Sequence, residues 1–327
     1  MARNVLAHVI RLVTLLFAVS VVTFVLVGLS PVDPVQANVG QNALLGMGEA
    51  KRAQLASHWG VDVPIWERYL SWLGDVLAGD WGTSLRYNAP VVQVVATRAA
   101  NSLLLLATAW LLSGVLGLVL GVAAGMLRDR LLDRVVRGLC YVLASTPAFW
   151  VGLLALMVFS VSLGWFPLGF SAPIGVPASK VTVFQSLHCM VLPALTLSLV
   201  SVPNIALHTR EKTVDVLESR YVRFARARGC STGQLLRSHV LRNVLLPAMT
   251  LQFAAISEIF GGSVLVEQVF SYPGLGQAAV TAGLGGDAPL LVAIALVSAA
   301  LVFCGNLAAN VLYGVVDPCM RPGEHHG

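Results

Sequence analysis

Long apolar runs separated by short charged segments constrain this chain more than any other feature of its sequence. The first run covers residues 9–29 and contains a single charged residue, Arg11. A helix of about 20 apolar residues is long enough to cross the hydrocarbon core of a bilayer. Over the whole chain 57% of residues are hydrophobic and only 11% are charged, a composition outside the range of soluble proteins. We therefore predict an all-α integral membrane protein without a separate soluble domain.

Six apolar runs qualify as spans, so residues 1–327 are predicted to form one transmembrane domain. The first run lacks a clear small-residue cleavage site after it, and we expect it to remain as an uncleaved span. The third run is expected to kink at Pro147, because proline removes a helix hydrogen bond that neighbouring hydroxyl groups can replace. The predicted spans are residues 9–29, 101–127, 135–163, 187–208, 244–269 and 289–316.

The distribution of basic residues predicts the orientation of these spans. Cytoplasmic loops of membrane proteins carry an excess of Lys and Arg. With six spans and a cytoplasmic N-terminus, fifteen of the 21 Lys and Arg lie inside and six lie outside. Both termini and residues 209–243 are then cytoplasmic, and residues 30–98 are extracytoplasmic. The net charge of +5 is explained by loops beside acidic lipid headgroups rather than by nucleic acid.

Two extracytoplasmic stretches have features of their own. Residues 65–77 are predicted to form an amphipathic helix with Trp66, Tyr69 and Trp72 at three-residue spacing. Trp and Tyr favour the headgroup level, so this helix either lies on the membrane surface or forms a lip that receives a delivered substrate. Residues 270–289 contain several glycines and no basic residue, and they are predicted to be an outer loop, partly re-entrant.

The connector between the fourth and fifth spans is the most charged part of the chain. Residues 209–247 carry eight Lys and Arg and three acidic residues. A face with small side chains lets a partner approach a helix backbone closely; the alternative is an amphipathic helix whose arginines meet lipid phosphates. At helical spacing the two faces carry Arg220, Arg223 and Arg226 on one and Val222, Ala225 and Gly229 on the other.

Few residues could carry chemistry within the spans. Glu258 is the best candidate for a water-filled pathway, because a carboxylate at membrane depth is costly; the alternative is a carboxyl group packed and hydrogen-bonded between helices. Asn204, Asn306 and Asn310 are suited to hydrogen bonds between helices. The candidate path residues are Pro147, Asn204, Glu258, Gly261 and Gly262.

Catalytic and metal-binding motifs are absent from the sequence. It contains no HExxH motif, no phosphate-binding glycine loop and no zinc-ligand spacing. The five cysteines are scattered and favour neither a disulfide framework nor a metal site. A membrane-embedded enzyme therefore lacks a catalytic constellation in this chain, and no catalytic residue and no metal ligand are predicted.

Several segments resemble ABC-transporter permeases of the dipeptide, oligopeptide and nickel branch. YVRFARARG (221–229), followed by HVLRNVLLP (239–247), resembles the cytoplasmic loop of that family. Further resemblances occur in the family's order along nearly the whole chain: HWGVDVPIWERYLSWLGDVLAGDWGTS (58–84), STPAFWVGLL (145–154), LPALTLSL (192–199), GGSVLVEQVFSYPGLG (261–276) and NLAANVLYGVVDP (306–318). Two departures are Asn310, where the family has an aspartate, and Cys319, which follows Asp317-Pro318 in place of arginine.

The resemblance implies a type I importer permease in a bacterial cell membrane. Residues 221–229 would be the coupling helix that docks on an ATPase subunit, with Ala225, Ala227 and Gly229 in close contact. The chain would bind no cofactor, since ATP and Mg²⁺ belong to two separate ATP-binding subunits. The other implied partners are a second homologous permease, forming a heterodimer, and an extracytoplasmic solute-binding protein. Carried over by position, the coupling residues are Tyr221, Ala225, Arg226, Ala227, Gly229, His239, Arg242, Asn243 and Pro247.

The resemblance leaves the substrate open between two classes. Di- or oligopeptides are favoured by how common that activity is in the family. Nickel or another metal chelate is the alternative, because a chelated metal needs no ligands from the pore. The direction of transport, import, follows from the resemblance alone. A scaffold without transport, whose arginines would only bind lipid, is a third interpretation of the basic connector.

Overall fold

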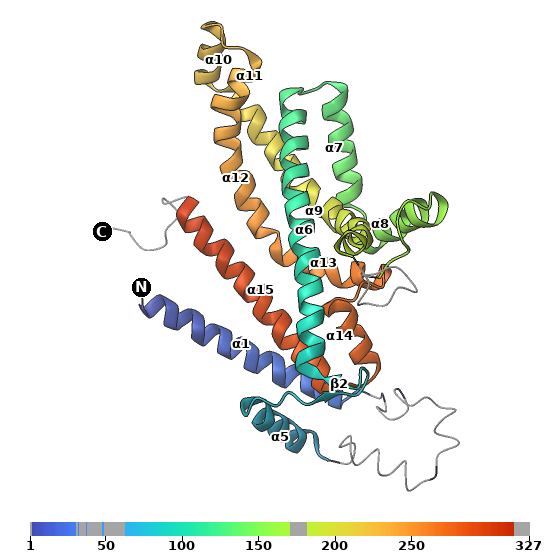
Figure 1. Ribbon diagram of the computed structural model, residues 1–327. Coiled ribbons are helices and arrows are strands. Elements are labelled where there is room, and N and C mark those ends of the chain that lie inside the picture. Colours follow the sequence, from blue (N-terminus) through green and yellow to red (C-terminus); the bar gives the residue numbers. More distant parts are fainter. Residues whose placement is uncertain are drawn as a thin grey trace. The chain divides into compact units, whose positions relative to one another are not determined.

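A computed structural model describes residues 2–30, 63–170 and 182–316 together with the isolated residues Val32, Ala37 and Gly48 (Figure 1). The chain forms two compact units, one of Met1–Ser102 with Pro273–Phe303 and one of Leu103–Tyr272 with Cys304–Gly327. The chain passes between them inside two long helices, α6 (Val91–Met126) and α15 (Ala288–Val316). Each unit is described below by itself.

The first unit contains the predicted amphipathic helix. Besides the first parts of α6 and α15, it comprises α1 (Ala2–Gly28), α5 (Ile65–Leu77), the antiparallel pair β1 (Thr83–Ser84) and β2 (Ala89–Pro90), and α14 (Leu275–Leu284). The prediction of a helix over residues 65–77 is confirmed with the same bounds. Two of its three aromatic residues pack on Phe24 of α1: the ring centroids of Tyr69 and Trp72 lie 5.4 and 5.9 Å from that of Phe24. Trp66 is exposed.

The prediction of an outer loop over residues 270–289 is wrong for its central part. This stretch contains α14, whose Leu275, Ala278 and Ala282 are buried against α6 and α15. Their three- and four-residue spacing places them on one helix face, and burial of that face stabilises a short helix that its glycines would otherwise weaken.

The second unit is built around α9 (Val183–Glu218). The other helices of this unit are α7 (Leu131–Ala144), α8 (Ala148–Ala155), the π-helix η1 (Leu156–Ser162), α10 (Arg220–Ala227), α11 (Thr232–Leu235), the π-helix η3 (Leu236–Val240), α12 (Leu241–Ala254) and α13 (Ile256–Val269). Its core joins Leu105 and Ala109 of α6 to Leu197 of α9, Ile259 of α13 and Phe270. These side chains come from distant parts of the sequence, so α9 organises the packing of the whole unit.

Four helices in the described part of the chain are long and apolar enough to cross a membrane: Leu6–Gly28, Val91–Met126, Val183–Glu218 and Ala288–Asn310. Two further apolar segments are bent pairs, Leu131–Ala144 with Ala148–Ser162 at 110° and Thr232–Ala254 with Ile256–Val269 at 49°. The predicted number of six spans therefore requires each bent pair to be one span.

Both bent pairs break more sharply than the sequence predicted. The break at Pro147 was predicted as a kink, but the angle of 110° makes it a sharp turn, and Pro147 is the residue immediately before α8. Proline disfavours helical backbone at the residue before it, which explains the position of this break. The break at Ala255 was not predicted, and neither proline nor glycine marks it in the sequence.

The connector predicted as a loop over residues 209–243 is largely helical. Helix α9 continues ten residues beyond the predicted end of the fourth span at His208, and Pro193 and Pro203 lie inside it without ending it. At 1.5 Å per residue the 36 residues of α9 make a helix about 54 Å long, of which about 15 Å extends past the predicted span.

A row of glycines lets α6 approach α9 closely. A Cβ atom at Gly121 would lie 2.6 Å from the carbonyl oxygen of Ala206, and one at Gly125 would lie 2.6 Å from Cβ of Thr213. A Cβ atom at Gly117 would lie 2.7 Å from Cβ of Ile205. Helices in membranes associate through small residues that allow such close backbone contact, so the sequence of α6 fixes its distance from α9.

Candidate functional site: the basic connector and its ion pairs

Helix α10 follows directly after the C-terminal end of α9 (Figure 1), and its own arginine holds it there. The guanidinium group of Arg223 donates from Nε and Nη2 to the backbone carbonyl of Glu218, at 2.9 and 2.8 Å. Carbonyl groups at a helix end lack partners within the helix and favour a cation. The contact therefore closes α9 and fixes the start of α10 at the same time.

Gly229 ends α10 through its backbone conformation. Its φ angle is +84°, a left-handed value that other L-residues adopt at a cost, and no atom lies within 4 Å of the position a Cβ would occupy. The N–H of Gly229 donates to the carbonyl of Arg226 at 2.9 Å, and that of Cys230 donates to Ala225 at 3.2 Å. Gly229 therefore terminates α10, and its predicted close contact with a partner stays a prediction.

The face with small side chains is covered by the chain itself. Val222 and Ala225 of α10 pack with Leu235, Val240 and Val244 of the following helices. An isolated helix of eight residues is not stable in water, so α10 depends on this packing. Ala225 is covered by residues of its own chain, and its contact with a partner stays a prediction. The same packing disfavours α10 as an amphipathic helix on lipid, since its small apolar face is turned inward.

The exposed face of α10 is aromatic and basic. Tyr221 and Phe224 are 48% and 65% exposed. The guanidinium carbon of Arg228 lies 5.9 Å from the ring centroid of Phe224, and the ring centroid of His239 lies at the same distance from that of Tyr221. Aromatic side chains held this way on a protein surface are typical of protein–protein contacts. Arg226 and Ala227, two of the predicted coupling residues, are also exposed on α10.

The segment that leads from α10 back toward the predicted fifth span begins in η3 and continues along α12. The side-chain amide of Asn243 donates to the carbonyl of His239 at 2.6 Å, one turn earlier. Arg242 and Asn243 are exposed, whereas Pro247 is half-buried inside α12. The structure thus brings Tyr221 and His239 together and places Arg242, Asn243 and Pro247 farther along the helix.

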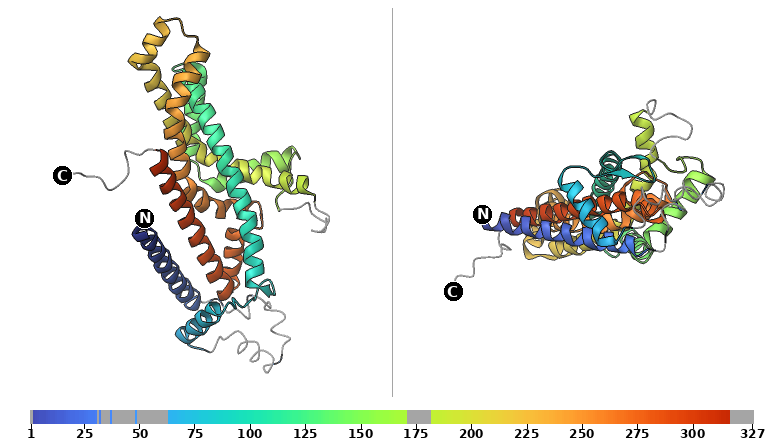
Figure 2. Two further views of the ribbon diagram at one scale, coloured as in Figure 1. Left: turned by 60° about the vertical axis from the view of Figure 1, so that its left-hand side comes forward. Right: turned by 90° about the horizontal axis from the view of Figure 1, so that it is seen from below.

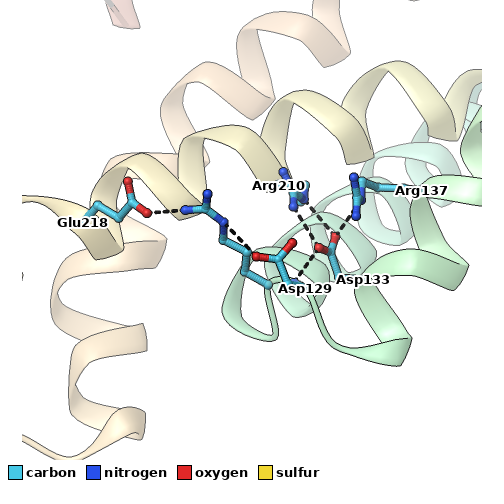
Figure 3. Close-up of polar contacts among 6 residues, drawn as sticks. Asp129, Asp133, Arg137, Arg210 and Glu218 are labelled. Carbon is cyan, nitrogen blue, oxygen red and sulfur yellow. Dashed lines mark hydrogen bonds and ion pairs between the residues drawn. The ribbon is translucent and has the colours of Figure 1, made fainter.

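A cluster of ion pairs joins α7 to α9 near this connector, and the sequence did not predict it (Figure 3). Asp133 at the start of α7 is fully buried. The Arg210 side chain on α9 donates from Nε and Nη2 to its two carboxylate oxygens, both at 2.8 Å. The N–H of Asp129 donates to the same carboxylate at 2.9 Å, and Arg137 adds an ion pair at 3.3 Å. The carboxylate of Asp133 therefore has three partners, the side chains of Arg210 and Arg137 and the backbone N–H of Asp129.

The charge state of Asp133 follows from these contacts. Asp133 lies in the first turn of α7, and the guanidinium groups of Arg210 and Arg137 balance the charge of its carboxylate. Arg128 extends the cluster: it pairs with Glu218 at the end of α9 and, at 3.4 Å, with Asp129. The turn between α6 and α7 is thus tied to α9 at two points, Arg210 and Glu218.

The candidate path residues lie on different helices of the second unit. Asn204 of α9 and Glu258 and Gly261 of α13 are exposed, Gly262 is half-buried, and Pro147 is exposed at the turn before α8. Glu258 follows directly after the break at Ala255. Exposed polar groups at membrane depth are costly against lipid, so this exposure indicates a face that another subunit or water covers. No contact brings these five residues together into one site in the described part of the chain.

Asn306 fulfils the interhelical role predicted for it. Its side-chain oxygen accepts a hydrogen bond of 2.6 Å from the hydroxyl group of Ser257. The bond joins α15 to the first turn of α13. It therefore ties the segment that carries Glu258 to a second helix.

The predicted lip in the first unit borders a cleft of about 580 Å³. Its lining includes the acidic residues Glu67, Asp75 and Asp80. Beside it, the fully buried carboxylate of Asp287 accepts hydrogen bonds from the Ser84 hydroxyl at 2.6 Å and from the backbone N–H groups of Arg86 and Leu290 at 3.1 and 3.2 Å. Asp287 thereby pins the β1–β2 turn to the start of α15.

Comparison with known proteins identifies the family. The family described as "Binding-protein-dependent transport system inner membrane component" matches residues 117–322, and a related family of N-terminal segments matches residues 1–104. The oligopeptide transport system permease protein AppB of Bacillus subtilis is 33% identical over 97% of this chain and 99% of its own length. A putative peptide permease protein of Brucella suis is 35% identical over 94% of this chain and 95% of its length. The glutathione transport system permease protein GsiC of Salmonella choleraesuis is 34% identical over 98% of this chain and 99% of its own length.

These matches cover nearly the whole chain and confirm the resemblance found in the sequence. The apolar helices described above agree with a multi-pass protein of the inner membrane. In transport systems of this family the membrane component forms the transport pathway, and separate subunits hydrolyse ATP. The chain belongs to the family of inner-membrane components of binding-protein-dependent transport systems.

Proposed function

We propose that this chain is one of two permease subunits of an ATP-driven importer for di- or oligopeptides. Family membership supports the transport role, and the names of the relatives support the peptide. Nickel or another metal chelate is disfavoured, because the relatives reported above are named for peptides or glutathione.

The observation that carries the proposal is the placement of α10. This short helix lies past the predicted membrane ends of α9 and α12 (Figure 2). Its Phe224 and Tyr221 side chains are exposed, and Val222 packs inward. A helix fixed on two long helices moves them when a partner grips it. We propose that the cytoplasmic ATP-binding subunit grips the exposed face, with Arg226 and Ala227 at the contact.

The remaining partners follow from the same proposal. A second, homologous permease covers the exposed polar face that carries Asn204, Glu258 and Gly261, and the two chains enclose the pathway. Two ATP-binding subunits hold ATP and Mg²⁺, and this chain binds neither. An extracytoplasmic solute-binding protein delivers the peptide to the side that bears α5.

The substrate proposal is tested with the complete complex, purified through an affinity tag on this chain and reconstituted in liposomes with its solute-binding protein. The probes are tri-alanine and a nickel–histidine chelate, and both ATP hydrolysis and uptake are measured. We expect tri-alanine, and not the chelate, to stimulate hydrolysis and to accumulate. Stimulation by the chelate alone would contradict the peptide assignment, and no response to either probe would contradict both substrate classes.

A matched pair of variants tests the docking face. Phe224→Ala removes an exposed ring from α10, whereas Phe184→Ala removes a still more exposed ring, 78% accessible, from the other end of α9. Truncating a central aromatic residue at an interface costs about 2 kcal/mol or more, so we expect Phe224→Ala to weaken binding of the ATP-binding subunit at least about thirtyfold. Equal effects of the two variants would contradict docking through α10.

A further inference from the structure

Apolar packing alone could hold α7 against α9, so the fold does not require the buried ion pair between these helices. Val136 and Cys140 of α7 already pack with Val202 and Ala206 of α9. Replacing a buried ion pair by apolar residues is often neutral or stabilising. The side chains of Asp133 and Arg210 differ from such packing in one respect: two parallel hydrogen bonds fix both the distance and the rotation between the groups.

Contacts connect this ion pair to the coupling helix without a gap, and Figure 3 shows the part of these contacts from Glu218 to Asp133. Arg223 of α10 donates to the carbonyl of Glu218, and the carboxylate of Glu218 pairs with Arg128. Arg128 pairs with Asp129, whose N–H donates to Asp133. The end of α9 that carries α10 is therefore attached to the beginning of α7 through the turn between α6 and α7.

We propose that Asp133 is a positioning residue that locks α7 to α9, so that α7 moves with the coupling helix as part of one lever. The inference rests on the proposed docking of the ATP-binding subunit on α10. Packed helices can slide along apolar contacts by small shear movements. The two-pronged bond to Arg210 prevents that sliding, because any shift along α9 breaks it and leaves a buried charge unpaired.

The geometry also defines where this lever ends. Helix α7 stops at Ala144, and the chain turns by 110° into α8 at Pro147. A rigid movement of α9 with α7 therefore carries the chain up to this turn. Beyond it, α8 leaves in another direction and makes its own contacts, including Phe270 against Gly152. The turn at Pro147 is then the point at which motion driven from α10 meets the rest of the unit.

The test measures the distance between α7 and α9 in the working complex. Spin labels are placed through Arg134→Cys on α7 and Lys212→Cys on α9, both exposed, in a background free of native cysteines. The distance is recorded without nucleotide and after trapping with ATP and vanadate. In the otherwise unchanged chain we expect the same mean distance and the same narrow distribution in both states. A mean distance that differs between the states would overturn the proposal.

Matched substitutions show whether the ion pair is the cause. Asp133→Asn is expected to broaden the distribution and make its mean depend on nucleotide. Asp215→Asn, at an exposed carboxylate on α9 outside this cluster, is expected to leave it unchanged. Arg210→Lys keeps the charge but loses the planar two-pronged donor, so it should also broaden the distribution, and it serves as the second variant if Asp133→Asn fails to assemble. Identical distributions in Arg210→Lys and Asp215→Asn would overturn the proposal.

A second readout separates the lever from a purely structural role. If Asp133 only stabilises the fold, its substitution lowers ATP hydrolysis and tri-alanine uptake in proportion to the amount of assembled complex. If it locks the lever, we expect hydrolysis per assembled complex to stay within about twofold while uptake of tri-alanine per ATP falls at least about tenfold, a loss of coupling of roughly 1.4 kcal/mol. A proportional fall of both would overturn the proposal. Failure of ATP-binding subunits to remain bound in the unchanged chain would instead contradict docking through α10.

Discussion

Gly121 offers a direct test of the close packing between α6 and α9. In Gly121→Ala the new Cβ would lie 2.6 Å from the Ala206 carbonyl oxygen and 2.6 and 2.8 Å from the Cβ and Cγ2 atoms of Thr209. Ordinary contacts at such a site are about 3.4 Å or longer, because atoms interdigitate at van der Waals distance in a packed interior. Helix α6 must therefore withdraw by about 0.8 Å, since the backbone oxygen cannot rotate away.

The expected magnitude combines two opposing effects. Alanine is favoured over glycine inside a helix by about 0.5–1 kcal/mol. Adding a methyl group to a closely packed site costs about 1–3 kcal/mol. We expect a net loss of about 1–2 kcal/mol for Gly121→Ala. Gly138→Ala is the matched control, because Gly138 lies inside α7 with no atom within 4 Å of its Cβ position, and only the favourable effect remains there.

The assay is denaturant-driven unfolding of the purified protein in detergent, with both variants prepared in the same way. The midpoint should fall for Gly121→Ala and stay equal or rise for Gly138→Ala. A midpoint for Gly121→Ala at or above that of Gly138→Ala would show that α6 and α9 are not in close contact there, and the account of the glycine row would be wrong.

Three further predictions concern the end of α10, the β1–β2 turn and the ion pair of Asp133. At Gly229, whose φ is +84°, we expect Gly229→Asn to retain peptide-stimulated hydrolysis and Gly229→Val to lose it, because Asn tolerates left-handed backbone and β-branched residues do not; equal activity would contradict the helix-ending role. Asp287→Asn should cost about 1–3 kcal/mol and accelerate hydrogen exchange of residues 85–88, whereas Asp80→Asn should not; unchanged exchange would show that Asp287 does not pin the turn. In Asp133→Asn the guanidinium group of Arg210 loses its charged partner, so this variant should unfold at a lower denaturant concentration than the unchanged chain; an equal or higher midpoint would contradict the role of the ion pair.

The sequence predicted those elements whose signal is local. Helix α5 was predicted with its observed bounds, Ile65–Leu77, because its aromatic side chains recur on one face. The turn at Pro147 was located for a similar reason, since proline marks a break wherever it falls at the start of a helix. Its angle depends on what α8 packs against, which no local pattern contains.

The elements that the sequence missed depend on contacts between distant residues. The break at Ala255 has no proline or glycine beside it. Ala225 was assigned to a partner because its small side chain suits close contact, but the same property suits burial under Val240 and Val244. Asp133 lies in a predicted basic loop where charges are expected for orientation alone, and its partner Arg210 is 77 residues away. Only the fold shows that this charge is internal.

The exposed face of α10 is the proposed docking surface for the ATP-binding subunit on the cytoplasmic side. A photo-reactive phenylalanine analogue placed at Phe224 in living cells tests this docking, with the same probe at Phe184 as the control. We expect a covalent adduct between this chain and an ATP-binding subunit from position 224 and none from position 184. Adducts from position 224 to lipid or to extracytoplasmic protein alone would contradict it.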